Sequence, residues 1–278
     1  MVKEVTLLKK MSKNKISVLI NAKNEEKFIA DCLESVKWAD EVLVFINPDS
    51  TDKTEERARQ FKVRIMEQKP REMDFAAWHN QGLKEAKGDW LLWVDADERI
   101  PPLLREEIKL SIISKACCYA INHQSSISAF ALPRRNFLLG KELKHGGWSP
   151  DYVKRLFKKK NLKKWVGELH EEPIFEGEMG HLKNPMIHLQ PERIEPALEK
   201  SLIWSGIEAD LLFKAKHPQI TWWRVLRMGA TTLFDRLIKK RGFLDGTEGW
   251  IESVYQSYHT IVIYLRLWGK QQGEKRDE

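Results

Sequence analysis

The chain has 278 residues, of which 42% are hydrophobic and 31% charged, a composition typical of a globular protein and not of a disordered one. The formal net charge of +7 favours anionic partners such as nucleotides, phosphorylated glycans, anionic lipid or nucleic acid. The cysteines, Cys32, Cys117 and Cys118, show neither metal-site spacing nor a disulfide framework, which fits a reducing cytosol. The N-terminal sequence MVKEVTLLKKMSKNK lacks a secretory apolar stretch, and no run of about 18 uncharged apolar residues occurs, so we expect a cytoplasmic protein without a transmembrane helix.

Apolar runs alternate with helical patterns between residues 16 and 94. We expect strands at 16–20, 42–46, 62–66 and 90–94, and helices at 25–38, 55–60 and 74–87. This alternation predicts βαβ units and a mainly parallel sheet. Ligands of such sheets bind beyond the carboxyl ends of the strands. Polar clusters follow three of the expected strands, at 21–26, 47–52 and 95–98.

The rest of the chain divides into three parts. Residues 101–114 predict one more helix, residues 117–190 predict mixed strands and long loops, and residues 195–278 are mostly helical in pattern. No internal repeat is evident.

Asp95-Ala96-Asp97 directly follows the expected strand 90–94. Two carboxylates one residue apart at a strand end can bind a divalent cation together with the phosphates of a ligand. Such a cation would offset the charge that builds up on a departing diphosphate. An acidic turn that caps the next helix is the alternative explanation, and the place of the pair after a nucleotide-binding half favours the cation.

Three segments of the first half resemble the family 2 glycosyltransferases: SVLINAKNEEKFIADCLESVKWADEVLVF, NPDSTDKT and FAAWHNQGLKEAKGDWLLWVDADE. Later segments resemble the branch of bacterial lipopolysaccharide-core β-glucosyltransferases: GKELKHGGWSPDYVKRLFKKK, GELHEEP, LKNPMIHLQ and GFLDGTEGW. The resemblance covers roughly residues 14–255. It implies an α/β fold of the GT-A type, in which a Rossmann-like, mainly parallel sheet is flanked by helices, with a helical C-terminal region.

The same resemblance implies a domain division and an activity. The catalytic domain would span residues 1–194, with a nucleotide-sugar half at about 14–115 and an acceptor half at about 116–194. A helical, basic, tryptophan-rich region would follow at 195–278. The implied reaction is an inverting transfer from a nucleotide-sugar, UDP-glucose or a similar donor, to a hydroxyl of a lipopolysaccharide-core or other cell-envelope glycan or glycolipid, assisted by Mn²⁺ or Mg²⁺.

The resemblance implies roles for individual residues at the donor end. The residues expected to contact the nucleotide-sugar are Ala22, Asn24, Glu25, Asn47, Asp49, Asn80 and Asp95. Asn47 stands where the family usually has an aspartate, and an amide can hydrogen-bond a base but supplies no carboxylate; Asp49 is the alternative for that contact. The resemblance implies that Asp97 and His188 hold the metal together. Imidazole suits manganese better than magnesium. A core histidine is the alternative for His188.

An inverting transfer needs a base near the acceptor hydroxyl, and a single carboxylate suffices. Glu171 is the first candidate and Asp151 the second, while His170 is expected to orient the carboxylate or to act as the base itself. A solvated acidic turn is the alternative for Glu171. The expected acceptor residues are Gly147, Trp148 and Asp245; for Trp148 the alternative is a core tryptophan beside a simple turn.

Two basic runs indicate an anionic surface as a partner. Residues 154–164 carry seven Lys and Arg without an acid, and residues 214–241 carry eight with Asp235 as the one acid. Basic and aromatic side chains on a helix suit an anionic membrane or a phosphorylated inner core. We therefore expect a peripheral position on the inner face of the cytoplasmic membrane, with a solvated helix face as the alternative.

Two other functions fit parts of the sequence. One is transfer of a sugar to a polyprenyl phosphate, for which the basic C-terminal region would hold the phosphate. The other is a nucleic-acid- or nucleotide-binding protein without glycosyl transfer, which the basic runs support. The sequence contains no RNP, helix-turn-helix, zinc or P-loop pattern, so no nucleic-acid partner is expected.

Overall fold

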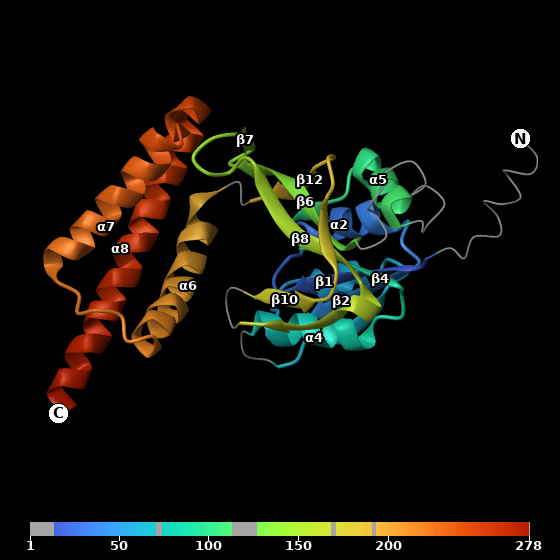
Figure 1. Ribbon diagram of the computed structural model, residues 1–278, viewed down its shortest axis with the longest axis horizontal. Coiled ribbons are helices and arrows are strands. Elements are labelled where there is room, and N and C mark those ends of the chain that lie inside the picture. The colour runs from blue at the N-terminus through green and yellow to red at the C-terminus, as the bar shows by residue number, and fades with distance from the viewer. Residues whose placement is uncertain (1–13, 71–73, 113–126, 168–170, 191–192, 278) are drawn as a thin grey trace, which may run out of the picture. The chain divides into compact units, whose positions relative to one another are not determined.

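The computed structural model describes residues 14–70, 74–112, 127–167, 171–190 and 193–277 (Figure 1). The chain forms two compact units, which we call the sheet unit, Met1–Pro133 with Tyr152–Met186, and the helical unit, Arg134–Asp151 with Ile187–Glu278. The predicted boundary at residue 194 therefore differs from the observed division, because residues 134–151 and 187–194 belong with the C-terminal helices.

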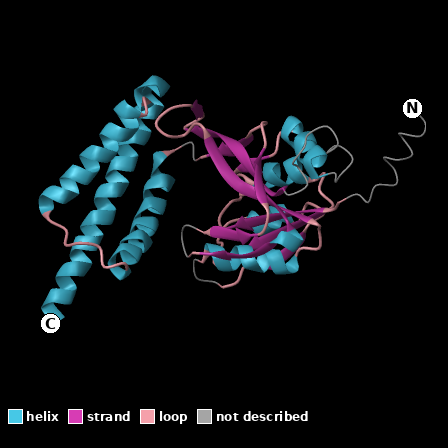
Figure 2. Ribbon diagram, viewed as in Figure 1, coloured by secondary structure: helices cyan, strands magenta, loops and turns pink. Residues whose placement is uncertain are grey.

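The first half of the sheet unit alternates strands and helices, as the sequence predicted (Figure 2). Its elements are β1 (Ile16–Ala22), α2 (Ile29–Val36), β2 (Glu41–Ile46), α3 (Thr54–Ala58), β3 (Arg64–Glu67), α4 (Phe75–Glu85), β4 (Trp90–Trp93), β5 (Glu98–Arg99) and α5 (Pro102–Ile112). The second half is formed by strands: β6 (Ile127–Leu138), β8 (Asp151–Lys158), β9 (Leu162–Val166), β10 (Glu172–Phe175), β11 (Glu178–His181) and β12 (Met186–Leu189). Strands β6, β8 and β12 have residues in both units.

The sheet is mixed and mainly parallel in its first half. β1 pairs in parallel with β2 and β4, and β2 pairs in parallel with β3. β8 then pairs antiparallel with β4, so that the order begins β3-β2-β1-β4-β8-β6. The polar segments that follow β1, β2 and β4 consequently lie along one edge of the sheet, where ligands of parallel sheets bind.

Both faces of this sheet are covered, which explains why β1 reads as a continuous apolar run. Val18 and Ile20 pack on one face, in a core shared with α2, α3 and α5. Leu19 points to the other face, in a core shared with α4 and β9. The predicted α/β fold is confirmed.

Local chemistry sets where the helices begin. The carboxylate of Asp74 accepts a hydrogen bond of 2.8 Å from the backbone N–H of Ala77, which caps the start of α4. The helix expected at 25–38 is regular only over Ile29–Val36, because Asn24 adopts the left-handed conformation with a φ of 56° and turns precede Ile29.

The helical unit is built around one long helix. Its elements are β7 (Lys141–Leu143), α6 (Ile194–Lys214), α7 (Trp222–Phe234), a π-helical turn (Asp235–Lys239), a 3₁₀ turn (Gly242–Asp245) and α8 (Gly246–Asp277). Figure 1 shows α8 between α6 and α7, and α8 packs against both. The predicted helical C-terminal region is confirmed. Among the described residues, no helix is both long enough and apolar enough to cross a membrane.

Candidate active site

The end of β4 carries the predicted acidic cluster, and a buried arginine holds it. Arg155 of β8 contacts the carboxylate of Asp95 through Nη2, and the same atom lies 3.0 Å from Oε1 of Glu98. The backbone N–H of Asp95 donates to Oε2 of Glu98 at 2.9 Å. Burial disfavours the charged form of Arg155, but the two carboxylates outweigh this effect and raise its pKa above the ordinary arginine range. A permanent positive charge therefore anchors Asp95, while Asp97 follows two residues later, half-buried.

The prediction that the basic run 154–164 presents a membrane-binding surface is wrong for Arg155, which is buried against these acids. The run forms strands and a short turn, not an exposed helix. Lys154 and Lys163 form ion pairs with glutamates, Glu172 and Glu176 respectively. Three of the seven cations of this run, Lys154, Arg155 and Lys163, are therefore paired with acids of the sheet unit.

The loops after β1 and β2, which carry the expected nucleotide residues, are tied together by hydrogen bonds. The side-chain oxygen of Asn24 accepts from the backbone N–H of Thr51 at 2.8 Å. The backbone N–H of Glu25 donates to the hydroxyl of Thr54 at 2.7 Å. Ala22 is buried at the end of β1, so only its backbone can face a ligand. The two loops thus form one structure at the carboxyl edge of the sheet.

Asn47 shapes this edge from inside the protein. Its amide nitrogen donates to Oε1 of Gln68 at 2.8 Å, and its amide oxygen accepts from the backbone N–H of Asp49 at 3.0 Å. Because Asn47 is buried with both ends of its amide engaged, its observed role differs from the expected contact with the base. Asp49 is the exposed acid of this turn.

A hollow of about 420 Å³ lies beside the carboxyl ends of β2 and β3. It is lined by polar and charged side chains from the turn after β2, and by residues of β3. Its lining includes Asn47, Ser50, Asp52, Arg59 and Glu67. The volume is within the range of small-ligand sites, about 300–1,000 Å³.

Asn80, expected among the nucleotide residues, instead holds β9 against α4. Its amide nitrogen donates to the carbonyl of Trp165 at 2.9 Å, and its amide oxygen accepts from the N–H of Trp165 at 2.8 Å. The neighbouring His79 stacks on the Trp165 indole, with ring centroids 4.5 Å apart. The strand that leads toward Glu171 is therefore fixed by α4.

Glu171, the first candidate base, is half-buried and directly precedes β10 in the sheet unit. His170 lies outside the described residues. Glu172, the next residue, forms the ion pair with Lys154 described above. Glu171 remains the first candidate for the base.

The second candidate base belongs to a chain of hydrogen bonds in the helical unit. Oδ2 of Asp151 accepts from Nδ2 of Asn136 and from Nε of Arg134, both at 2.9 Å. Oδ1 of Asn136 lies 2.6 Å from Nδ1 of His188. Because a carboxylate only accepts, it assigns the amide nitrogen of Asn136 to Asp151 and the oxygen to His188. Nδ1 of His188 therefore carries a proton and donates it to this amide oxygen.

The expected acceptor loop is held by Asp245. The carboxylate accepts from the backbone N–H groups of Lys144 and His145, at 3.0 and 2.7 Å, and from Nδ1 of His145 at 2.8 Å. Gly147, with a φ of 92°, and Trp148 follow in this loop. Arg236 donates to the carbonyl of Gly146 at 3.1 Å, and its guanidinium lies 5.9 Å from the ring centroid of Trp148. Asp245 is buried, so it positions the loop instead of contacting an acceptor itself.

The donor set for a divalent cation is small but chemically suitable. Asp97, half-buried after β4 in the sheet unit, offers a carboxylate. Among the described residues, no group of three or more His, Cys, Asp or Glu is gathered for a metal. One or two protein ligands are the usual number where substrate phosphates complete the coordination. A carboxylate such as that of Asp97 therefore fits a cation that binds together with a nucleotide diphosphate.

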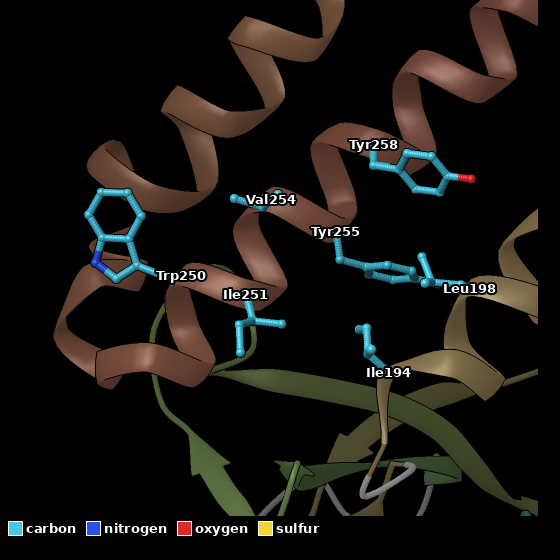
Figure 3. A pocket seen from close by; sticks show the side chains of 7 residues that line it. All are labelled: Ile194, Leu198, Trp250, Ile251, Val254, Tyr255 and Tyr258. Carbon is cyan, nitrogen blue, oxygen red and sulfur yellow. The ribbon is translucent and has the colours of Figure 1, made fainter.

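The helical unit also contains an apolar groove of about 450 Å³ between α6 and α8 (Figure 3). Ile194 and Leu198 of α6 face Tyr255 of α8 across it. The hydroxyl of Tyr255 donates to the carbonyl of Ala197 at 3.0 Å. The remaining lining residues are Trp250, Ile251, Val254 and Tyr258. An apolar segment of a ligand suits such a lining.

Residues 17–165, more than half of the chain, match the model of the family described as Glycosyl transferase family 2. The chain belongs to this family. It is therefore an enzyme that uses a nucleotide-sugar, with a GT-A fold, and the predicted family, fold and enzyme class are confirmed.

Relatives and solved structures extend the likeness over most of the chain. The lipopolysaccharide core biosynthesis glycosyltransferase LpsC of Rhizobium meliloti (strain 1021) is 23% identical over 267 residues, which are 91% of this chain and 92% of LpsC. An uncharacterized glycosyltransferase of Rickettsia bellii (strain RML369-C) is 25% identical over 272 residues, 91% of this chain and 86% of the relative.

Two solved structures are similar to this one. TarS 1–349 of S. aureus, in complex with UDP-GlcNAc, is 13% identical with a TM-score of 0.46, covering 94% of this chain and 92% of TarS 1–349. Glucosyl-3-phosphoglycerate synthase of Mycobacterium tuberculosis, in complex with Mn²⁺, UDP and glucosyl-3-phosphoglycerate, is 16% identical with a TM-score of 0.46, covering 74% of this chain and 81% of the synthase.

Sequence reasoning missed the residues that hold the site together. Arg155 was hidden in a basic run, and Asn136 and Gln68 occur in no motif that we could identify. For Arg155, the one available signal was the strand pattern of β8, because every second side chain of a strand lies on the same face of the sheet.

Proposed function

We propose that this enzyme transfers a hexose, with inversion, from UDP-glucose or a similar donor to a hydroxyl of a lipopolysaccharide-core or other cell-envelope glycan. The observation that carries the proposal is the acidic cluster at the end of β4, anchored by Arg155, in a chain of family 2. The likeness to LpsC along 91% of the chain supports the class of acceptor.

The donor is held at the carboxyl edge of the sheet. Asp95, fixed by Arg155, accepts hydrogen bonds from hydroxyls of the ribose or the sugar. Asn24, Glu25 and Asp49 belong to the joined loops that border the nucleotide. Asp97 would hold Mn²⁺ or Mg²⁺, with His188 as the second predicted ligand, and the cation would supply positive charge against the diphosphate leaving group.

The acceptor side activates and positions a hydroxyl. Glu171 takes the proton of this hydroxyl while the oxygen attacks the anomeric carbon from the face opposite to the leaving group. Gly147 and Trp148 border the acceptor, and an indole ring can stack on a sugar face. Asp151, whose carboxylate already accepts two hydrogen bonds, orients Asn136 and His188.

The decisive experiment is calorimetry of purified protein with a panel of nucleotide-sugars, with and without Mn²⁺, on the wild type and on Asp97→Ala. We expect one UDP-sugar to bind in a metal-dependent manner and the variant to lose this binding. In an assay with that donor, Glu171→Gln should lower kcat by about 10²–10⁴-fold and leave donor affinity unchanged. Absence of binding for every donor, with and without metal, would refute the proposal.

A second candidate function is transfer to a polyprenyl phosphate, which the apolar groove between α6 and α8 favours because it suits a hydrocarbon chain. A phosphate acceptor is already anionic and needs no strong base. The Glu171→Gln variant separates the two functions: unchanged turnover with polyprenyl phosphate would support this candidate, and the loss of turnover expected for a hydroxyl acceptor would exclude it.

We also propose that the enzyme works as a peripheral protein at the cytoplasmic face of an anionic membrane, where a lipid-linked acceptor is found. The basic helical unit supports this location, since Lys and Arg near a surface of anionic lipid each contribute about 1 kcal/mol.

A further inference from the structure

Helix α7 presents a row of large apolar side chains to solvent. Trp222, Leu226 and Phe234 are 76%, 60% and 60% exposed. They are spaced by four and eight residues, which places them on one face of the helix. Trp223, beside the row, and Ile238, in the π-helical turn that follows, are also exposed. We call Trp222, Leu226, Phe234 and Ile238 the α7 row.

Helix α7 packs on α8 through other residues, which adjoin the α7 row on the helix surface. Val225 belongs to a buried cluster with Leu267 of α8. The carbonyl of Gly229 accepts a hydrogen bond of 2.8 Å from the hydroxyl of Ser257. A Cβ on Gly229 would lie 2.6 Å from the side chain of Ile261, so the two helices are in close contact here. The α7 row is therefore not needed to fold the helical unit.

The segment that carries the α7 row is rich in positive charge. Arg224, Arg227, Arg236, Lys239, Lys240 and Arg241 lie between residues 222 and 241, with Asp235 as the one acid in this segment. Asp235 is shared by Lys239 and Lys240, at 3.7 and 2.7 Å. The guanidinium of Arg227 lies 5.4 Å from the ring centroid of Trp223. The positive charge of Arg227 therefore lies next to the exposed ring of Trp223, beside the α7 row.

We propose that the α7 row and its surrounding cations dock on an anionic lipid bilayer. Four large apolar side chains with a surplus of cations need a partner that offers both hydrocarbon and dense negative charge, and an anionic bilayer offers both. A helix of this kind lies in the interface, with its apolar face in the headgroup and acyl boundary. Trp222 and Trp223 suit this depth because indole rings prefer the membrane interface. This inference rests on the proposed peripheral function and names the face that carries it.

The test is co-sedimentation of the full chain with vesicles of phosphatidylglycerol and phosphatidylcholine, and with vesicles of phosphatidylcholine alone. We expect binding to the anionic vesicles that is at least tenfold weaker on the neutral ones and is weakened by salt, because exposed charges are screened. The triple variant Trp222→Ser/Leu226→Ser/Phe234→Ser should lose at least tenfold in vesicle binding. The matched control is Leu103→Ser/Leu110→Ser on α5 of the sheet unit, where the two leucines are 73% and 69% exposed, and it should bind like the wild type.

A second pair of variants tests the charge. Arg227→Gln/Lys239→Gln should weaken binding to anionic vesicles several-fold, whereas Lys37→Gln/Lys109→Gln in the sheet unit should leave it unchanged.

Equal binding of the triple variant and the wild type would overturn the proposal, and so would equal loss in the α5 control. A wild type that dimerises through the α7 row, seen as a concentration-dependent sedimentation coefficient lost in the triple variant, would assign the face to a second copy instead. Calorimetry with the UDP-sugar on the same variants keeps the two proposals apart, because donor binding should be unchanged in all of them.

Discussion

Arg155 shows how one buried side chain sets the chemistry of the donor end. It lies beneath two carboxylates, one of which, Glu98, is completely buried. A buried ion pair gives little net stability, but removal of one partner is costly because it leaves the other charge without compensation. The arginine therefore holds the cluster together with the hydrogen bond from the backbone N–H of Asp95 to Glu98.

Replacement of Arg155 with methionine should lower the free energy of unfolding by about 3–5 kcal/mol, because Glu98 and Asp95 would lose their shared cation. Urea unfolding at neutral pH measures this loss. The adjacent Lys154→Met is the control, since Lys154 forms an exposed pair with Glu172 and should change the free energy by about 0–1 kcal/mol. Equal effects of the two substitutions would contradict the role of Arg155.

The buried His79 makes stability depend on pH. Burial lowers its pKa from 6.5 to about 4, so the folded chain keeps this residue neutral where the unfolded chain binds a proton. The contribution of neutral His79 to the free energy of unfolding is fully present above pH 6.5 and is lost as the pH falls toward 4. The loss is about 3 kcal/mol, from the size of the pKa shift. In urea unfolding between pH 7 and 4, His79→Phe should lack this part of the decrease, while the half-buried His217→Gln should retain it.

At the level of elements, the junction before α8 depends on a close backbone contact. A Cβ on Gly249 would lie 2.0 Å from the carbonyl oxygen of Gly242. The first turn of α8 and the 3₁₀ turn are therefore in backbone contact, and no room is left for a side chain at residue 249. Gly269, in the same helix, has open space around the corresponding position.

Gly249→Ala should therefore destabilise the protein by at least about 1–3 kcal/mol through overpacking. Gly269→Ala should stabilise it by about 0.5–1 kcal/mol, because alanine loses less entropy than glycine in a helix interior. Thermal unfolding of both variants gives the comparison. A stabilising effect at Gly249 would show that the junction is looser than the backbone contact requires.

Periodicity predicted the elements whose apolar pattern is contained within a single short segment. β1, β2 and β4 are apolar runs with polar ends, and the Asp74 cap marks the start of α4, so these could be located from the sequence to within a few residues. The association of residues 134–151 with the C-terminal helices could not, because the bonds that form it join groups as far apart as His145 and Asp245. For the same reason the sequence named His188 and Asp151 separately, and Asn136, which links them, carried no signal.

For the whole molecule, ligand binding should appear as stabilisation. A UDP-sugar with Mn²⁺ at about 100 times its Kd should stabilise the folded chain by about 2.7 kcal/mol, which corresponds to roughly 5 °C in Tm. Chelation of the metal with EDTA should abolish the increase, and Asp97→Asn should show none. An increase of the same size in EDTA would exclude the metal from donor binding.

The bonds between Asp245 and the loop at His145 have a consequence for synthesis on the ribosome. Asp245 is translated 100 residues after His145, and translation at about 5–20 residues per second makes this an interval of roughly 5–20 s. During that time the backbone N–H groups of the loop lack the carboxylate that later fixes them. The sheet strands before residue 134 can be paired by then, whereas the loop at His145 gains its bonds to Asp245 only once the start of α8 has emerged. The nascent chain can therefore form the first half of its sheet before this loop is fixed.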